Sequence, residues 1–378
     1  MELKDIRVKI DDIDAKLVPL LKERFDCSLA VAEYKKANNL PILNTEREEQ
    51  IIESVMKAGG EHGSYIAAVY REIMGTSREL QQNEMVSHHD LAGTIVHAKS
   101  DLKSDTVIAC QGTQGAFSHM AASNLFPKGD IRFYGNFADV FRAVENGEAT
   151  YGVVPVENSN AGSVQEVYDL ILKYRHYIVA AAALKVNENL LGVKGSSIED
   201  IKTVYSHPQA LNQSDKFIKE HGFTPVQYSN TALAAKMVAE KGDKTVGAIA
   251  SVQAAQSFGL EVLAHDIQTV KANSTRFITI SKELIIPDDS NKVSVVFTLP
   301  HVTGSLYRIL NRFALKGLNL TKIESRTARN GRFEYEFYLD FSGNMNDRQT
   351  ISLVSTLQAE LPDFTFLGNY KEIELNNH

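Results

Sequence analysis

The segment Asn273-Ser274-Thr275-Arg276-Phe277 places an amide, two hydroxyl groups and a guanidinium side by side after a polar loop. The alternation that follows, Phe277-Ile278-Thr279-Ile280, predicts a strand. These polar groups would then lie at the mouth of a sheet, where open α/β sheets usually bind ligands. Taken alone, the segment also fits an ordinary polar turn that precedes a strand.

A second group of polar side chains falls on a long N-terminal helix. Arg24 is in register with an apolar seam of three-four spacing, so burial there would require an anion as partner. Lys35 lies about 20° around the axis from Arg24 and ~16 Å along it, which lets both cations reach one small dianion. Alternatively, Arg24 extends to water. The seam begins with Leu3, Ile6, Ile10, Ile13, Leu17 and Leu20 and continues through Arg24, Cys27, Val31 and Tyr34.

The length of this helix indicates a homodimer. Ended by Pro41, it would measure roughly 50 Å, more than a small monomeric domain can cover. Arg7 lies ~25 Å from Arg24, so it would join the same site only from an antiparallel partner helix. We therefore expect an interlocked homodimer, with a kink in the helix at Pro19.

Two further helices complete this N-terminal segment. The pattern Thr45-Glu46-Arg47-Glu48 predicts a capping box at the start of the second helix, so Glu48 would either cap that helix or face the site. On the third helix, Ser77 and Gln81 are four residues apart within an apolar stripe. Such residues line a pocket or are tolerated at the surface.

Residues 1–83 resemble the all-helical chorismate mutase family, which rearranges chorismate to prephenate without a nucleophile. The reaction needs the substrate held in its reactive chair, with both carboxylates bound and the ether oxygen stabilised. By this resemblance, Lys35 and Gln81 donate to the ether oxygen, and Glu48 donates only when protonated. Asn44 stands where an aspartate is common. The implied substrate-binding residues are Arg7, Arg24, Lys35, Asn44, Arg47, Glu48, Ser77 and Gln81.

After a predicted linker at residues 84–104, residues 105–282 alternate strand and helix. Polar turns follow two strands, at Gln111–His119 and at Ser206–Leu211, and each leads into a helix N-terminus that can bind an anion. Between them, the apolar strand that starts at Tyr151 ends in Glu157-Asn158-Ser159. This order predicts two α/β lobes with a cleft between them.

These signatures resemble prephenate dehydratase, whose catalytic domain has two lobes like a periplasmic binding protein. The resemblance implies conversion of prephenate to phenylpyruvate with loss of carbon dioxide and water, without a cofactor. The leaving hydroxide must be protonated, and Thr275 would be the nearest donor. Arg276 would hold a carboxylate or form an ion pair that bridges lobes. The other implied substrate-binding residues are Glu157, Asn158, Ser159, Ser206, His207 and Gln209.

Residues 292–372 predict a βαββαβ unit that resembles the ACT regulatory domain, which binds phenylalanine at a dimer interface. Its two signature loops would be Gly304-Ser305-Leu306 and Glu324-Ser325-Arg326. Ser305 replaces an alanine of the family and Thr327 replaces a proline. A dimerisation module without a ligand is the alternative.

Composition limits the other possibilities. A formal net charge of −7 over 378 residues argues against nucleic acid as a partner. No apolar run reaches the ~18 residues of a membrane span, no metal-ligand spacing occurs, and two cysteines suit reduced packing positions. We therefore expect a cytoplasmic, bifunctional enzyme that makes phenylpyruvate from chorismate and is inhibited by phenylalanine. A non-catalytic aromatic-acid sensor and a mutase fused to a prephenate dehydrogenase are the alternatives, and a tetramer remains open beside the dimer.

Overall fold

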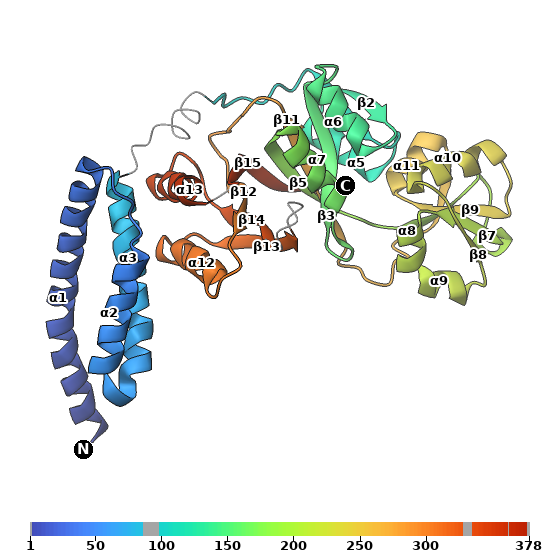
Figure 1. Ribbon diagram of the computed structural model, residues 1–378. Coiled ribbons are helices and arrows are strands. Elements are labelled where there is room, and N and C mark those ends of the chain that lie inside the picture. Colours follow the sequence, from blue (N-terminus) through green and yellow to red (C-terminus); the bar gives the residue numbers. More distant parts are fainter. Residues whose placement is uncertain (1, 86–97, 328–334, 362, 376–378) are drawn as a thin grey trace.

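The computed structural model describes residues 2–85, 98–327, 335–361 and 363–375 (Figure 1). The N-terminal domain comprises helices α1 (Leu3–Ala37), α2 (Thr45–Ala58) and α3 (Gly63–Met85), with a short 3-10 turn at Gly60–His62. Both α1 and α2 pack against α3. Most of the predicted linker, residues 86–97, lies outside the described part of the chain.

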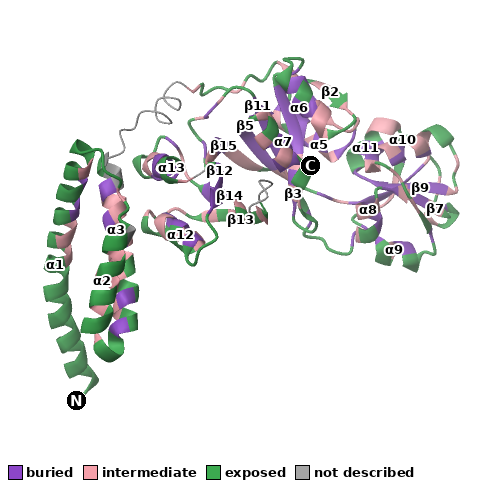
Figure 2. Ribbon diagram, viewed as in Figure 1, coloured by how far each residue is buried: buried purple, intermediate pink, exposed green. Residues whose placement is uncertain are grey.

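Helix α1 continues through Pro19 as one helix of 35 residues, which a rise of 1.5 Å per residue extends to about 50 Å. Its buried residues are Ser28 and Ala32, both in the C-terminal half. The apolar seam is not covered within one chain, since Leu3 is 63% and Leu20 62% exposed (Figure 2). Because these two residues lie only about one turn apart, most of the apolar face of α1 requires a partner.

The first lobe of the central domain is built on a sheet whose strands come from both ends of the segment. Strands β3 and β11 pair antiparallel at its centre, with β5 on the other side of β11. The pairing of β3 with β11 joins residues more than 110 positions apart. The elements are β1 (Val107–Gln111), α5 (Phe117–Leu125), β2 (Asp130–Tyr134), α6 (Phe137–Glu145), β3 (Tyr151–Asn158), β4 (Gly162–Ser163), α7 (Gln165–Tyr174), β5 (Tyr177–Lys185) and β11 (Ser274–Ser281).

The second lobe has its own sheet, in the order β10-β6-β9-β7-β8. Two chain crossings, at residues 186–188 and 265–273, connect it to the first lobe. The two-lobed α/β prediction is thus confirmed. The elements of this lobe are β6 (Asn189–Gly192), a 3-10 turn (Ile198–Asp200), β7 (Thr203–Ser206), α8 (Pro208–Gln213), α9 (Asp215–Glu220), β8 (Thr224–Gln227), α10 (Thr231–Lys241), β9 (Val246–Ala250), α11 (Val252–Phe258) and β10 (Glu261–Ala264).

The C-terminal segment has the predicted βαββαβ order. It comprises β12 (Lys292–Leu299), α12 (Ser305–Leu315), β13 (Leu320–Thr327), β14 (Tyr335–Ser342), α13 (Arg348–Glu360) and β15 (Thr365–Leu375). Strand β15 belongs to two units at once: residues 365–370 pair with β12, and residues 371–375 pair in parallel with β5. One sheet therefore runs through both, in the order β13-β14-β12-β15-β5-β11-β3-β1-β2.

This continuous sheet curls over on itself. Strand β14 is four positions from β11 in the sheet, or about 19 Å along a flat sheet at ~4.8 Å per strand. Yet Arg276 on β11 and Asp340 on β14 are joined by an ion pair of 2.7 Å. The curl thus brings the C-terminal strands over the centre of the first lobe.

The N-terminal and C-terminal units also touch directly. Glu72 on α3 accepts hydrogen bonds from Tyr307 Oη at 2.9 Å and from Asn311 Nδ2 at 2.8 Å, both on α12. Glu79, two residues before Gln81 on α3, pairs with Lys316 at 3.0 Å. The helix that carries two predicted mutase residues therefore rests on the C-terminal domain.

Candidate active sites

In the helical domain, two predicted pairs lie between α1 and α3. Arg24 Nη1 donates to Ser77 Oγ at 2.6 Å, and Lys35 Nζ donates to Gln81 Oε1 at 3.3 Å. Ser77 and Gln81 are buried, whereas Arg24 and Lys35 are half-buried. The structure thus places both cations on one face of α1, as the spacing predicted, and Arg24 does not extend to bulk water.

Glu48 joins this group through a residue that the sequence interpretation missed. It forms an ion pair with Arg78, which follows Ser77 on α3. Burial lowers the pKa of Lys35, and the nearby carboxylate of Glu48 partly opposes that fall. The pair of Lys35 with the Ile42 carbonyl oxygen, at 2.5 Å, further fixes its ammonium group. The signal for Arg78 was available, because it lies three residues before Gln81 on α3, a spacing that puts two helical residues on neighbouring positions of one face.

Three other predicted mutase residues lie differently. Asn44 is the N-cap of α2, and its side chain accepts from the Arg47 backbone N–H at 3.0 Å. The predicted capping box was therefore wrong by one residue, because Asn44 performs the capping that we assigned to Thr45, and Glu48 is free for Arg78. Arg47 and Arg7 are exposed. Within one chain, Arg7 belongs to the uncovered half of α1 and is separated from the others.

In the central domain, Thr275 and Asn158 are register partners on β11 and β3. Asn158 Nδ2 donates to Thr275 Oγ1 at 2.9 Å, and Thr275 is 9% exposed. The amide orientation is fixed, since Asn158 Oδ1 accepts from the backbone N–H groups of Asn160 at 3.1 Å and Ala161 at 3.0 Å. The nitrogen must therefore face the threonine.

The second lobe reaches this pair through α8. Gln209 Nε2 donates to Asn158 Oδ1 at 3.4 Å. One turn later, Gln213 Oε1 accepts from Asn273 Nδ2 at 3.0 Å, and Asn273 Oδ1 accepts from Asn158 Nδ2 at 2.8 Å. Asn273 belongs to the polar segment that the sequence singled out. Gln213 was missed as a site residue, although the four-residue spacing of Gln209 and Gln213 on one helix predicts a common face.

The remaining predicted residues of this site have mixed roles. Ser206 is fully buried and donates to the Ile249 carbonyl oxygen at 2.5 Å, so it supports β7. His207 is the N-cap of α8, and its Nδ1 accepts from the Gln209 N–H at 3.3 Å. Burial lowers the pKa of His207, which favours a neutral ring with its proton on Nε2. Ser159 Oγ accepts from the Ser274 N–H at 3.0 Å and ties the two strand ends together.

A second inter-lobe contact lies at the turn after β1. Ser251, at the N-terminus of α11, donates to the Gly115 carbonyl oxygen at 2.8 Å. Gly115 has a φ of +79°, and a Cβ there would lie 2.7 Å from Ala254 Cα. Only glycine allows this approach of the lobes. On the same turn, His119 Nδ1 accepts from the Gly115 N–H at 3.1 Å, and burial lowers the pKa of this histidine.

Glu157 and Arg276 lie on the opposite face of the sheet from Thr275. They are register partners, one residue along from the Asn158–Thr275 pair, so they project from the opposite face of the sheet. Arg276 binds Asp340 at 2.7 Å, Glu157 at 3.3 Å and Glu372 at 3.5 Å. Arg276 therefore forms ion pairs within the protein and does not face the side on which it would hold a substrate carboxylate. These ion pairs join the first lobe to the C-terminal domain, and not to the second lobe.

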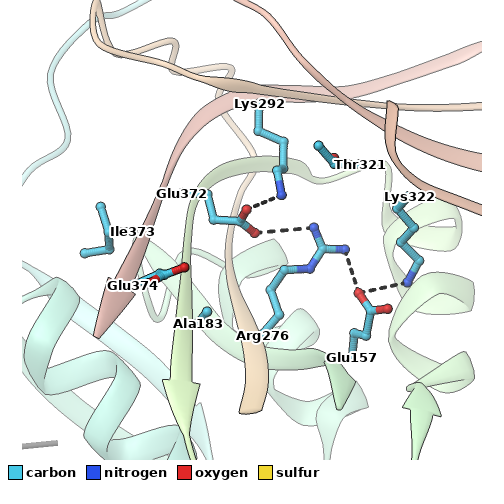
Figure 3. A pocket seen from close by; sticks show the side chains of 9 residues that line it. All are labelled: Glu157, Ala183, Arg276, Lys292, Thr321, Lys322, Glu372, Ile373 and Glu374. Carbon is cyan, nitrogen blue, oxygen red and sulfur yellow. Dashed lines mark hydrogen bonds and ion pairs between the residues drawn. The ribbon is translucent and has the colours of Figure 1, made fainter. Parts of the chain in front are cut away.

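These charges line a cavity of about 320 Å³ inside the curl of the sheet (Figure 3). Lys322 on β13 pairs with Glu157 at 3.3 Å, and Lys292 on β12 pairs with Glu372. Burial alone would lower the pKa of Arg276, but Asp340 and the other surrounding groups outweigh it and raise that pKa. The cavity thus belongs to a charged interface and lies behind the Asn158–Thr275 pair.

The two predicted effector loops also separate. Gly304, Ser305 and Leu306 line a cavity of about 500 Å³ at the start of α12, together with Tyr307 and Phe337. In contrast, Glu324 accepts from Ser163 Oγ, and Arg326 donates to the Gln165 carbonyl oxygen at 3.3 Å. Glu324 and Arg326 therefore face the first lobe of the central domain, whereas Ser325, on the opposite face of β13, is exposed.

Comparison with known proteins agrees with the two predicted catalytic domains. Residues 6–82 match chorismate mutase type II, and residues 108–284 match prephenate dehydratase. The bifunctional chorismate mutase/prephenate dehydratase of Aquifex aeolicus is 32% identical over 98% of this chain and 98% of its own length. The chain belongs to this family. It is a chorismate mutase and a prephenate dehydratase of phenylalanine biosynthesis, as the sequence predicted, and not the sensor.

Two further relatives support the dehydratase assignment. Arogenate dehydratase/prephenate dehydratase 1 of Arabidopsis thaliana is 38% identical over 79% of this chain and 83% of its own length. The crystal structure of prephenate dehydratase from Arthrobacter aurescens in complex with L-Phe is 30% identical, with a TM-score of 0.64 over 70% of this chain and 89% of that chain. Among the described residues, no helix is long and apolar enough to cross a membrane, and no cluster of metal-ligating side chains occurs.

Proposed function

We propose that Thr275 protonates the leaving hydroxyl of prephenate, and that Asn158 makes this possible. The observation that carries the proposal is the direction of their hydrogen bond: the amide donates to Thr275 Oγ1. The threonine proton is therefore available to the substrate. As that proton leaves, the amide N–H stabilises the charge that develops on Oγ1.

The surroundings of Asn158 strengthen this effect. Its carbonyl oxygen accepts from two backbone N–H groups and from Gln209, which polarises the amide and makes its N–H a better donor. Gln209 comes from the other lobe, so the complete arrangement forms only when the lobes are together. We propose that His207, as a neutral Nε2–H donor, and the turn at Gly112–His119 bind the substrate carboxylates.

For the mutase, we propose a site completed by a second chain. Arg24, Lys35 and Gln81 form one side, and Arg7 of the partner helix supplies the missing guanidinium when the exposed seams of two α1 helices pack together. Arginine suits the substrate carboxylates because its planar fork binds both oxygens. The Glu48–Arg78 ion pair would form a further side of the pocket.

The C-terminal domain, by this proposal, is an ACT domain that binds L-phenylalanine as a feedback inhibitor. The cavity at Gly304–Leu306 supports it, and so does the L-Phe complex of the Arthrobacter relative. Because Glu324 and Arg326 face the dehydratase lobe, we propose the first loop and not the second as the effector contact. The enzyme would act in the cytoplasm as a homodimer.

Separate activity measurements on one purified chain test these roles. Thr275→Ala should abolish phenylpyruvate formation from prephenate and leave the rearrangement of chorismate within twofold of the parent. Arg24→Ala should do the reverse. Dehydration that survives in Thr275→Ala would reject Thr275 as the proton donor. A folded Arg24→Ala with normal mutase kinetics would reject the carboxylate role.

A further inference from the structure

The charged interface inside the curl of the sheet adjoins the Asn158–Thr275 pair through the backbone. Arg276 directly follows Thr275 on β11, and Glu157 directly precedes Asn158 on β3. Between Arg276 and Phe277 the register of these strands shifts, so that Phe277 faces Pro155 and Val156 is left over as a bulge. The ladder is thus weakened one residue beyond the pair that holds the proton donor.

The C-terminal domain holds the side chains of both Arg276 and Glu157. Asp340, 6% exposed, binds Arg276 at 2.7 Å and is itself fixed by Ser294 Oγ at 2.6 Å. Lys322, whose side chain is 9% exposed, binds Glu157 at 3.3 Å and also donates to Ser163 Oγ at 2.8 Å. The Arg276–Asp340 pair is buried on both sides, and such a pair holds its geometry tightly, because moving either partner leaves an uncompensated charge. In the second pair Lys322 is buried, whereas the Glu157 side chain is 36% exposed.

We infer that Asp340 and Lys322 are positioning residues for the dehydratase reaction. They hold Arg276 and Glu157 on one face of β11 and β3, and thereby fix Thr275 and Asn158 on the other face. The C-terminal domain would then have a second role besides effector binding: it completes the catalytic geometry of the dehydratase even when no effector is bound. This inference rests on the proposed role of Thr275.

The size of the effect follows from the geometry of proton transfer. A displacement of about 1 Å in a reacting group can lower a rate by 10². Neither Asp340 nor Lys322 lies on the substrate side of the sheet, so their loss should lower kcat far more than it changes KM. A role in stability alone would instead lower the amount of active enzyme and both activities together.

The test uses the full-length enzyme without phenylalanine and measures both activities in each preparation. Asp340→Asn keeps the shape but removes the charge and one of the two acceptor oxygens, and Lys322→Met removes the charge from a chain of similar length. We expect each to lower the dehydratase kcat at least tenfold, with KM within threefold and mutase activity within twofold. Lys322→Arg restores the charge and should recover most of the rate.

Arg312→Met is the matched control, because Arg312 forms a half-buried ion pair with Glu360 between α12 and α13, away from β3 and β11. It should leave the dehydratase kcat within twofold. A normal kcat in both Asp340→Asn and Lys322→Met would overturn the inference, and so would an equal loss in Arg312→Met or in mutase activity. Thr275→Ala is measured in parallel: if it remains active, the proposed proton donor fails, whatever the interface variants show.

Discussion

Glu188 should make the dehydratase domain less stable as the pH rises, and Glu188→Gln should remove that dependence. This residue lies in the first crossing between the lobes and is 2% exposed. Its carbonyl oxygen accepts from the Ile267 N–H at 2.9 Å, and its own N–H donates to Gln268 Oε1 at 2.9 Å, both in the second crossing. Within the described part of the chain, its Oε2 has no hydrogen-bond partner.

Burial raises the pKa of Glu188 from 4.5 to about 7. Below pH 4.5 the carboxyl is protonated in both the folded and the unfolded chain, so its full contribution to stability is present. Between pH 4.5 and about 7 only the unfolded chain ionises, and that contribution is progressively lost. At 1.36 kcal/mol per pKa unit, the free energy of unfolding falls by about 3 kcal/mol over this window.

Glutamine has a similar shape and does not ionise. Relative to the parent, Glu188→Gln should therefore gain about 3 kcal/mol in stability between pH 4.5 and pH 8, whatever constant difference exists at low pH. Exposed Glu166 on α7 provides the control, and Glu166→Gln should follow the parent profile.

The assay follows urea unfolding at Cys110, which is fully buried on β1 of the first lobe. In a Cys27→Ser background, a thiol reagent that acts from pH 5 to pH 8 labels Cys110 only when this domain unfolds. Parallel profiles for the parent and Glu188→Gln across this range would refute the reasoning, since they would show that Glu188 ionises at the same pH in both states.

Three further predictions concern the two sites. Arg7→Ala and Arg24→Ala chains should each lack mutase activity, but the mixed and re-associated chains should regain up to about a quarter of it, because one intact site forms per heterodimer; no recovery would reject the shared site. Mutase activity should fall at alkaline pH as Lys35, whose pKa is lowered by burial, loses its proton; Lys35→Arg should extend the active range upward, as the pH profile of kcat/KM would show. Gln213→Leu should lower the dehydratase kcat about tenfold through the loss of its bond to Asn273, with the mutase rate as the internal check.

The sequence alone determined the local structures and the candidate groups. Periodicity placed Arg24 and Lys35 on one face of α1, because helical geometry fixes relative angles without knowledge of the rest of the fold. The segment around Thr275 was identifiable for a similar reason, since a polar cluster at the start of an apolar alternation indicates a strand end. The length and the apolar seam of α1 also predicted that this helix packs against a second chain.

Tertiary structure decided which face of each strand the neighbouring residues serve. Thr275 and Arg276 are adjacent in the chain, but the pleat sends one toward Asn158 and the other toward Asp340. The role of Arg276 depends on a sheet that joins two domains through β15 and then curls, and no short-range pattern encodes that contact. The separation of Glu324 and Arg326 from Gly304–Leu306 has the same cause. The sequence predicted effector binding by both loops, and only the position of the first lobe shows that Glu324 and Arg326 contact that lobe.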